Sequence, residues 1–340
     1  MPVPNLLHIA LSIAAIQGPD GIAFRQPQLA RDGQQVFLTM GAGNAVYFAR
    51  SPNGGGTFHK PVRIADGGKL MLGRHRGPRI AAENGRIVVS AIVNGDLLSW
   101  RSPDQGATWS QPVRVNSVPQ AAREGLHAMA AGAGLVAAVW LDLRQQGMRL
   151  YSAVSRDGGA SWLENKLVYE SPDGHICECC HPSVKVGPNG EIVAMWRNWL
   201  NGNRDMYLAR STDGGRTFAK AVKAGTGSWQ LNACPMDGGD VALTGSGGSW
   251  TAFRRDTSII LAAPDGAETQ LGTGKDPAMA LGAKGAVIAW TNAGIRIAHA
   301  PYREPVLLDP AGSYPHVVGG PDVVVAWESA SGIKVARIAE

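Results

Sequence analysis

The amino-acid sequence predicts an all-β protein, a β-propeller of seven four-stranded blades that occupies residues 1–340 as a single domain. The first observation behind this prediction is an eight-residue pattern that begins at positions 51, 102, 155 and 211, at intervals of 51, 53 and 56 residues. Such an interval is the length of one four-stranded blade. Second, strand-like segments recur in the same order beyond the last copy. Third, 44 glycines and 21 prolines against 17% charged residues fit a protein with many tight turns.

The repeated pattern has the chemistry of a turn between two strands. Its copies read SPNGGGTF at 51–58, SPDQGATW at 102–109, SRDGGASW at 155–162 and STDGGRTF at 211–218. Asp or Asn at the third position accepts hydrogen bonds from nearby backbone N–H groups, and glycine takes a positive φ at little cost. The closing Trp or Phe then anchors the turn by burial. Because turn chemistry accounts for every position, we expect these segments to be structural.

The pattern S-x-D-x-G-x-[TS]-[WF] resembles the Asp box, or BNR repeat, of the sialidase (neuraminidase) superfamily. In that superfamily the Asp boxes lie away from the active site, which agrees with a structural role here. The typical sialidase propeller has six blades, whereas the repeats of this chain can be laid out as seven. We expect seven blades, with six as the alternative if the fifth or sixth repeat is an elaboration of its neighbour.

Each repeat is expected to supply an inner strand, two middle strands and an outer strand. The inner strands are expected to begin at residues 24, 76, 126, 180, 234, 275 and 313, mostly beside a proline. The second strands are rich in β-branched and aromatic residues and are expected at 36–40, 87–93, 135–140, 192–196, 250–254, 286–290 and 323–327. The third strands are expected at 45–50, 97–101, 149–154, 206–210, 258–262, 295–299 and 333–337.

The last repeat lacks an outer strand, because the sequence ends at Glu340 just after the seventh third strand. The N-terminal run from Leu6 to Ser12 is expected to supply it. Pairing one terminus with the other removes an exposed sheet edge, which is a liability for an open β array. The same run lacks the positively charged region of a signal peptide, so we favour the strand interpretation.

Charge and hydropathy exclude some classes of partner. The net charge of +5 comes without a run of Lys and Arg, so nucleic acid is not expected as a partner. The sequence contains no run of 18 or more apolar residues, so a membrane span is not expected. The net positive charge is compatible with an acidic glycan or an acidic small molecule as the binding partner. The resemblance to exported Asp-box propellers implies a periplasmic or secreted location.

Four long loops are expected on one face of the ring, around its axis, at 66–77, 117–127, 170–181 and 225–236. All four cysteines fall on two of them. The soft donors gathered on this face are Cys177, Cys179, Cys180, His181, Cys234, Met236, His127 and Met129. Thiolates, thioethers and imidazoles suit Cu(I), or Zn if only Cys and His bind. Two disulfides are the other interpretation, with a reactive thiol as a third.

The sialidase resemblance implies a different site on the same face. Sialidases hold the substrate carboxylate with three arginines, use a Tyr activated by a Glu as nucleophile, and use an Asp as acid and base. The segment FRQP resembles the first-arginine motif and carries Arg25, and GSYP places Tyr314 where the family has its nucleophile. Glu124 is the candidate partner of Tyr314, and Asp66 is the candidate acid and base.

Further basic and aromatic residues are expected around this site. Arg197 and Arg254 end second strands on the functional face and are candidates to complete the anion clamp. The candidate substrate contacts are Arg79, Arg144, Trp199 and Arg204.

The sequence therefore favours an exo-acting glycosidase of sialidase type, which hydrolyses a terminal sialic acid or a related acidic sugar and needs no cofactor. A copper- or zinc-binding or thiol-based propeller is the first alternative, and a non-catalytic glycan- or protein-binding propeller is the second. The glycosidase hypothesis leaves the cysteine loops unexplained, and a fold alone does not settle function.

Overall fold

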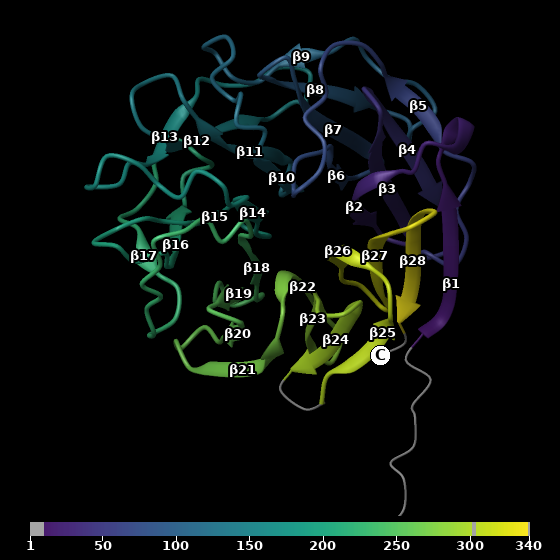
Figure 1. Cartoon of the computed structure of the whole chain (residues 1–340). Helices are drawn as coiled ribbons and strands as arrows, with labels where there is room; N and C mark the ends of the chain where they lie inside the picture. The colour runs from purple at the N-terminus through teal and green to yellow at the C-terminus, as the bar shows by residue number, and fades with distance from the viewer. Residues whose placement is uncertain (1–9, 301–303, 339–340) are drawn as a thin grey trace, which may run out of the picture.

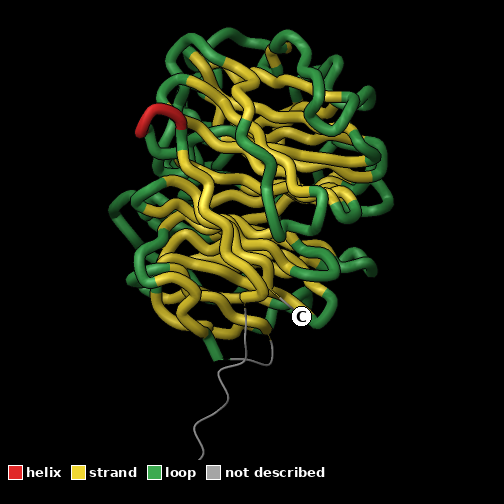
Figure 2. The backbone as a smooth tube through the Cα atoms, turned by 90° about the vertical axis from the view of Figure 1, so that its right-hand side faces the viewer, coloured by secondary structure: helices red, strands yellow, loops and turns green. Residues whose placement is uncertain are grey.

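The chain forms a ring of seven four-stranded antiparallel sheets, seen along its axis in Figure 1. The structure is a computed structural model that describes residues 10–300 and 304–338. The expectation of seven blades is confirmed, and the six-blade alternative is wrong: the fifth and sixth repeats are complete blades. Figure 2 shows strands joined by loops and turns, with the 3-10 turn η1 (Pro19–Gly21) as the one helical segment of the described residues.

The first four blades contain the Asp-box turns between their third and fourth strands. From the inner to the outer strand they consist of β2 (Arg25–Asp32), β3 (Gln35–Ala42), β4 (Ala45–Ser51) and β5 (Val62–Ala65); β6 (Arg79–Glu83), β7 (Arg86–Val93), β8 (Asp96–Ser102) and β9 (Val113–Arg114); β10 (His127–Gly132), β11 (Leu135–Asp142), β12 (Arg149–Ser155) and β13 (Lys166–Tyr169); and β14 (Ser183–Val186), β15 (Ile192–Arg197), β16 (Met206–Ser211) and β17 (Val222–Lys223).

The last three blades keep the same order without the full Asp box. They consist of β18 (Gly239–Leu243), β19 (Ser249–Arg255), β20 (Ser258–Ala262) and β21 (Glu268–Thr273); β22 (Lys275–Gly282), β23 (Gly285–Thr291), β24 (Ile295–Ala300) and β25 (Val306–Asp309); and β26 (Ser313–Val318), β27 (Val323–Ser329), β28 (Gly332–Ile338) and the N-terminal β1 (Ala10–Gln17). In the described residues, no helix has the length and hydropathy needed to cross a membrane.

The two ends of the chain close the ring. β1 pairs antiparallel with β28, from Ala10 opposite Ile338 to Gln17 opposite Gly332, and Figure 1 shows the purple β1 beside the yellow β28. The predicted closure is confirmed, and the described strand runs from Ala10 to Gln17, beyond the expected end at Ser12; residues 6–9 lie outside the described residues. The outer edge of blade seven is thereby paired.

The Asp-box turns have the hydrogen bonds that their sequence predicts. Asp213 Oδ1 accepts from the backbone N–H of Arg216 and Thr217 at 2.9 and 3.0 Å, and Asp213 Oδ2 accepts from the Thr217 hydroxyl at 2.6 Å. These bonds hold the pKa of Asp213 below its usual value. Gly215 has φ +84°, and a Cβ there would lie 2.5 Å from Val154 of the preceding blade. The turn is therefore both folded locally and packed against its neighbour.

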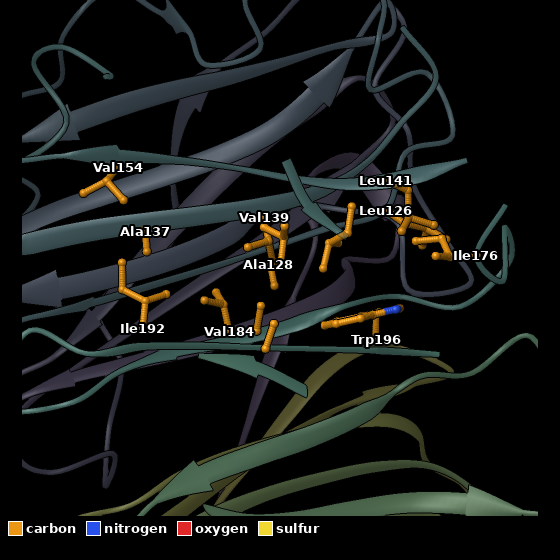
Figure 3. Packing of buried hydrophobic residues seen from close by; sticks show 14 of the residues in the cluster. Leu126, Ala128, Ala137, Val139, Leu141, Val154, Ile176, Val184, Ile192 and Trp196 are labelled. Atoms are coloured by element: carbon orange, nitrogen blue, oxygen red, sulfur yellow. The ribbon is translucent and has the colours of Figure 1, made fainter. Parts of the chain in front are cut away.

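The hydrophobic core lies between adjacent sheets. Figure 3 shows it between blades three and four, where Val139 and Ala128 face Val184 and Trp196. Four second strands place a fully buried tryptophan at or near their ends, namely Trp140, Trp196, Trp290 and Trp327. Because each sheet buries both faces against neighbours, no blade has a complete core alone.

Closure makes a testable prediction about β1. Ile16 is 7% exposed and packs in the cluster shared by blades one and seven, whereas Ile13 on the same strand is 52% exposed. We expect Ile16→Ala to lower the free energy of unfolding by about 2–4 kcal/mol, since it removes buried methyl groups and leaves a cavity. Ile13→Ala is the matched control, with an expected change of less than about 0.5 kcal/mol. Chemical denaturation measures both, and equal effects would contradict the role assigned to β1.

Candidate functional site

Three inner strands begin with the same backbone conformation. Gln26, Asp276 and Tyr314 each precede a proline and have φ of +55°, +56° and +53°. Each lies where the pairing of the inner strand with the second strand shifts register. Residues other than glycine avoid positive φ, so its repetition in three blades marks a built feature. It places these residues at the starts of β2, β22 and β26, which surround the centre of the ring (Figure 1).

Side chains from four blades meet there in what we call the axial cluster: His75, His181, Asp276 and Tyr314. The Nε2 atom of His75 lies 2.8 Å from Oδ1 of Asp276. The His75 ring stacks on His181 with centroids 4.0 Å apart, and it meets the Tyr314 ring edge-on at 5.0 Å. Burial is the largest single influence on Asp276 and opposes its ionisation, but the hydrogen bond to His75 and the charges of His75 and Lys275 together hold the pKa of Asp276 below its usual value.

The structure brings Arg25 and Tyr314 to this mouth. Arg25 Nε lies 3.7 Å from Oε2 of Glu328, whose Oε1 accepts from the backbone and side-chain N–H groups of Gln26 at 2.7 and 2.8 Å. Burial raises the pKa of Tyr314, and the negative charges of Asp276 and Glu328 raise it further, while Arg25 acts in the opposite direction. The charges of Arg25, Asp276 and Glu328 therefore all act on the Tyr314 hydroxyl.

Glu124 and Asp66 are placed with other partners. Glu124 forms an ion pair with Arg76, whose Nε also donates to the Glu124 carbonyl at 2.7 Å. Asp66 follows the outer strand β5 and pairs with Arg63 at 2.6 Å, with both side chains more than half exposed. The carboxylates that act on Tyr314 are Asp276 and Glu328, which the sequence analysis did not select.

The two arginines expected to complete an anion clamp meet at a buried carboxylate instead. Arg197 is 1% exposed; its Nη2 lies 3.5 Å from Asp237 Oδ1, and its Nη1 donates to the Arg204 carbonyl at 2.6 Å. Arg254 Nε lies 3.3 Å from Asp237 Oδ2. The same oxygen accepts from the backbone N–H of Asp276 at 3.2 Å. Asp237 thus ties both arginines to the axial cluster.

The residues predicted to contact substrate also form interactions within the protein. Arg79 is buried and donates to the backbone carbonyls of His75, Gly77, Pro78 and His127, and burial lowers its pKa to about 10. His127 in turn bonds Ser90 Oγ at 3.0 Å through Nε2.

Arg144 forms a bidentate ion pair with Asp142, with N–O distances of 2.8 and 2.9 Å, and its guanidinium lies over the Tyr151 ring. The Arg204 guanidinium stacks on the Trp199 ring at 3.9 Å, and its Nη1 donates to Cys177 Sγ at 3.2 Å. Trp199 and Arg204, predicted as sugar contacts, therefore lie beside the cysteines.

Three of the four cysteines form what we call the thiol cluster: Cys177, Cys179 and Cys180. Their Sγ atoms lie 3.4, 3.7 and 3.8 Å apart, and the residues are 1, 9 and 1% exposed. Met236 packs against them. Cys234 is exposed and does not belong to the group of mutually close donors. All four cysteines are free, so neither of the two disulfides considered from the sequence is formed.

Backbone and side-chain bonds fix the loop that carries the thiol cluster. The Cys177 N–H donates to the Arg197 carbonyl at 3.1 Å, and the Gly238 N–H donates to His181 Nδ1 at 3.1 Å. Hydrogen bonds between Cys177 and the Cys179 and Cys180 sulfur atoms, with the charges of Arg197 and Arg204, hold the pKa of Cys177 well below its usual value. Burial raises the pKa of Cys180. The neighbouring guanidinium groups and thiols therefore favour the thiolate form of Cys177.

Comparison with known proteins agrees with this architecture. The profile of the BNR repeat-like domain family matches residues 93–253. The match covers a little under half of a chain that forms a seven-bladed propeller. No curated protein sequence matches it.

Solved structures similar to this propeller include proteins of different activities. The NanB sialidase of Streptococcus pneumoniae superposes with a TM-score of 0.58 at 11% identity, over 95% of this chain and 70% of that one. A catalytically inactive virginiamycin B lyase of Staphylococcus aureus gives 0.57 at 14% identity, over 97% and 99%. A protein of unknown function from Dyadobacter fermentans gives 0.58 at 16%, over 97% and 98%. At such identities the likeness concerns the fold alone.

Sequence reasoning missed four polar residues of the propeller's mouth: His75, Asp237, Asp276 and Glu328. Asp276 had a signal, since it precedes the proline at the start of an inner strand, as Tyr314 does. His75 and Asp237 lie in or just after the long loops of the same face. Glu328 lies near the end of β27 and has no local sequence signal.

The partly buried His316 predicts a pH-dependent stability. His316 lines the axial cavity and accepts the Leu29 N–H at Nδ1, and burial lowers its pKa to about 3. Between about pH 6.5 and pH 3 the unfolded chain binds a proton at this site that the folded chain does not, so stability falls as the pH is lowered. The slope from this residue is at most about 1.4 kcal/mol per pH unit.

We expect His316→Asn, which keeps an acceptor for Leu29, to reduce that slope. The measurement is the free energy of unfolding at several pH values between 4 and 8. His59→Asn, on the exposed surface, is the control and should leave the slope unchanged. An unchanged slope in His316→Asn would show that His316 is not buried in its neutral form.

Proposed function

We propose that this propeller binds one thiophilic metal ion through Cys177, Cys179 and Cys180. The observation that supports the proposal is the set of Sγ separations, 3.4 to 3.8 Å. Sulfur ligands bound at about 2.3 Å to one ion at tetrahedral angles lie about 3.8 Å apart. The three thiols therefore need to move by only a few tenths of an ångström to share an ion.

The surroundings of the thiol cluster also favour a ligand role over simple packing. A buried cysteine commonly behaves as a small hydrophobic residue and needs no charged neighbour. Here the Arg204 guanidinium lies 3.2 Å from Cys177 Sγ, and Arg197 is buried nearby. A cation at this distance stabilises the thiolate, which is the form that binds metals.

The test is the metal content of protein purified without chelator, measured by elemental mass spectrometry. We expect about one metal ion per chain in the wild type, and loss of most of it in Cys177→Ser and Cys180→Ser, because each removes one of three ligands. Cys234→Ser is the matched control, since that thiol is exposed and outside the cluster, and it should retain the metal. Wild-type protein that binds no added metal, or that contains a Cys177–Cys180 disulfide instead, would refute the proposal.

A second candidate is hydrolysis of a glycosidic bond of an acidic sugar at the axial mouth. Arg25 and Tyr314, from blades one and seven, are brought together there with Glu328 and Asp276. In this hypothesis Arg25 binds the sugar carboxylate and Tyr314 attacks the anomeric carbon, while one of the two carboxylates accepts the phenolic proton and the bond from that carbon to the aglycone oxygen breaks. The departing oxygen takes a proton from water, and a second water molecule then hydrolyses the tyrosyl–sugar bond. The roles first considered for Glu124 and Asp66 pass to these carboxylates. The proposal includes a periplasmic or secreted location.

Fluorogenic glycosides of sialic acid and of uronic acids test this candidate. We expect Tyr314→Phe to lower kcat/KM by at least about a hundredfold, because the variant has no nucleophilic oxygen. Tyr207→Phe is the control, since Tyr207 packs beside Tyr169 and Trp196 on the third strand of blade four. Absence of turnover by the wild type, or full activity of Tyr314→Phe, would remove the glycosidase candidate and leave metal binding unaffected.

A further inference from the structure

We infer that the thiol cluster selects the monovalent ion Cu(I) over Zn(II), with the buried arginines around it supplying the countercharge. This inference rests on the metal-binding proposal above and goes further, because it names the ion. Two features of the described residues carry it: the number and kind of donors within reach, and the charge of the groups packed around the cluster.

The donor set has three members. Among the described residues, the His, Cys, Asp and Glu atoms within mutual ligand distance at this site are only the sulfur atoms of the thiol cluster. Structural Zn(II) sites almost always have four protein ligands in a tetrahedron. The neighbouring imidazole, His181, has its Nδ1 occupied by the Gly238 N–H and its ring stacked on His75. A set of three thiolates without a fourth nitrogen or oxygen ligand suits Cu(I) better than Zn(II).

The nearest additional donor is also soft. Met236 packs against the thiol cluster from the loop before β18. A thioether is a ligand for Cu(I) and a poor one for Zn(II). Met236 therefore adds to the preference whether it binds the ion or only excludes water from it.

The charges around the cluster favour the ion of lower charge. Three thiolates with Cu(I) carry a net charge of −2, and with Zn(II) a net charge of −1. The groups packed beside them are Arg204 and Arg197, which are buried, Asp237, which pairs with Arg197, and Arg254, which pairs with Asp237. Three guanidinium groups against one carboxylate give +2, which balances the Cu(I) complex. Buried charges are stable only when they are paired.

Two other charged groups near the cluster are exposed or paired. Glu178 projects from the cysteine loop, is more than half exposed and pairs with His175 at 3.4 Å. Glu124 is neutralised by Arg76. Water screens the exposed pair, so the buried arginines dominate the field at the sulfur atoms.

The positive charge of Arg204 is not neutralised by a carboxylate among the described residues, so it acts on the thiolates. Its guanidinium stacks on Trp199 and donates to Cys177 Sγ, and no ion pair with a carboxylate is formed within the described part of the chain. The adjacent Asp205 pairs with Lys223 at 3.1 Å. Arg204 is therefore a positioning residue that stabilises the negative complex and is not a metal ligand.

The experiment is a competition on the full-length protein under anaerobic conditions, with Cu(I) and Zn(II) each buffered by a chromophoric chelator. We expect one equivalent of Cu(I) to displace bound Zn(II), and X-ray absorption to show only sulfur ligands on copper. Arg204→Gln should weaken Cu(I) binding by roughly tenfold to a hundredfold, the range for groups that support metal ligands. Arg204→Lys keeps the charge and should recover most of that loss, while Zn(II) affinity should change less in both variants.

The outcomes separate the two proposals. Binding of neither ion by the wild type refutes metal binding itself. Retention of Zn(II) against excess Cu(I), or nitrogen and oxygen ligands on copper, refutes only the selectivity inferred here. Equal Cu(I) affinities of the wild type, Arg204→Gln and Arg204→Lys would refute the role of Arg204. Thermal unfolding of each variant checks that the fold is intact, and the wild-type competition decides selectivity without any variant.

Discussion

Pairing of β1 with β28 is the constraint on which the rest of the structure depends. A blade has two apolar faces, and each face is buried only when a neighbouring blade covers it, so an open array would leave two faces and one edge exposed. Closure by the N-terminal strand removes both problems at once. It also fixes the seven inner strands around one axis. Residues hundreds of positions apart, such as Gln26 and Glu328, then come within hydrogen-bond distance.

The axial cluster and the thiol cluster are two parts of one connected region. Cys180 and His181 are consecutive residues, and the ring of His181 stacks on His75. A second connection runs through Asp237, which accepts from the backbone of Asp276 and pairs with Arg197, whose carbonyl accepts the Cys177 N–H. The two clusters are therefore joined by ring stacking, hydrogen bonds and an ion pair.

The same network explains how this propeller differs from the sialidase pattern that its Asp boxes resemble. Arg197 and Arg254 occupy positions from which arginines can reach an axial ligand, but Asp237 neutralises both and Arg197 is fully buried. The buried positive charge is directed towards the cysteine loop, and Arg25 is left as the half-exposed arginine at the mouth. A propeller is compatible with many chemistries, and here the placement of one carboxylate decides which arginines are available to a ligand.

The sequence by itself determined the repeat length, the Asp-box turns, the blade number, the closure by an N-terminal strand and the positions of Arg25 and Tyr314 at inner-strand starts. These follow from turn chemistry and strand periodicity, which act over a few residues. Only the tertiary structure decided the partners: Asp237 for Arg197, Arg76 for Glu124, His75 for Asp276, and the separation of Cys234 from the other cysteines. Such pairs join different blades or distant loops. Their choice depends on burial and side-chain direction around the closed ring, and no local pattern in the sequence records it.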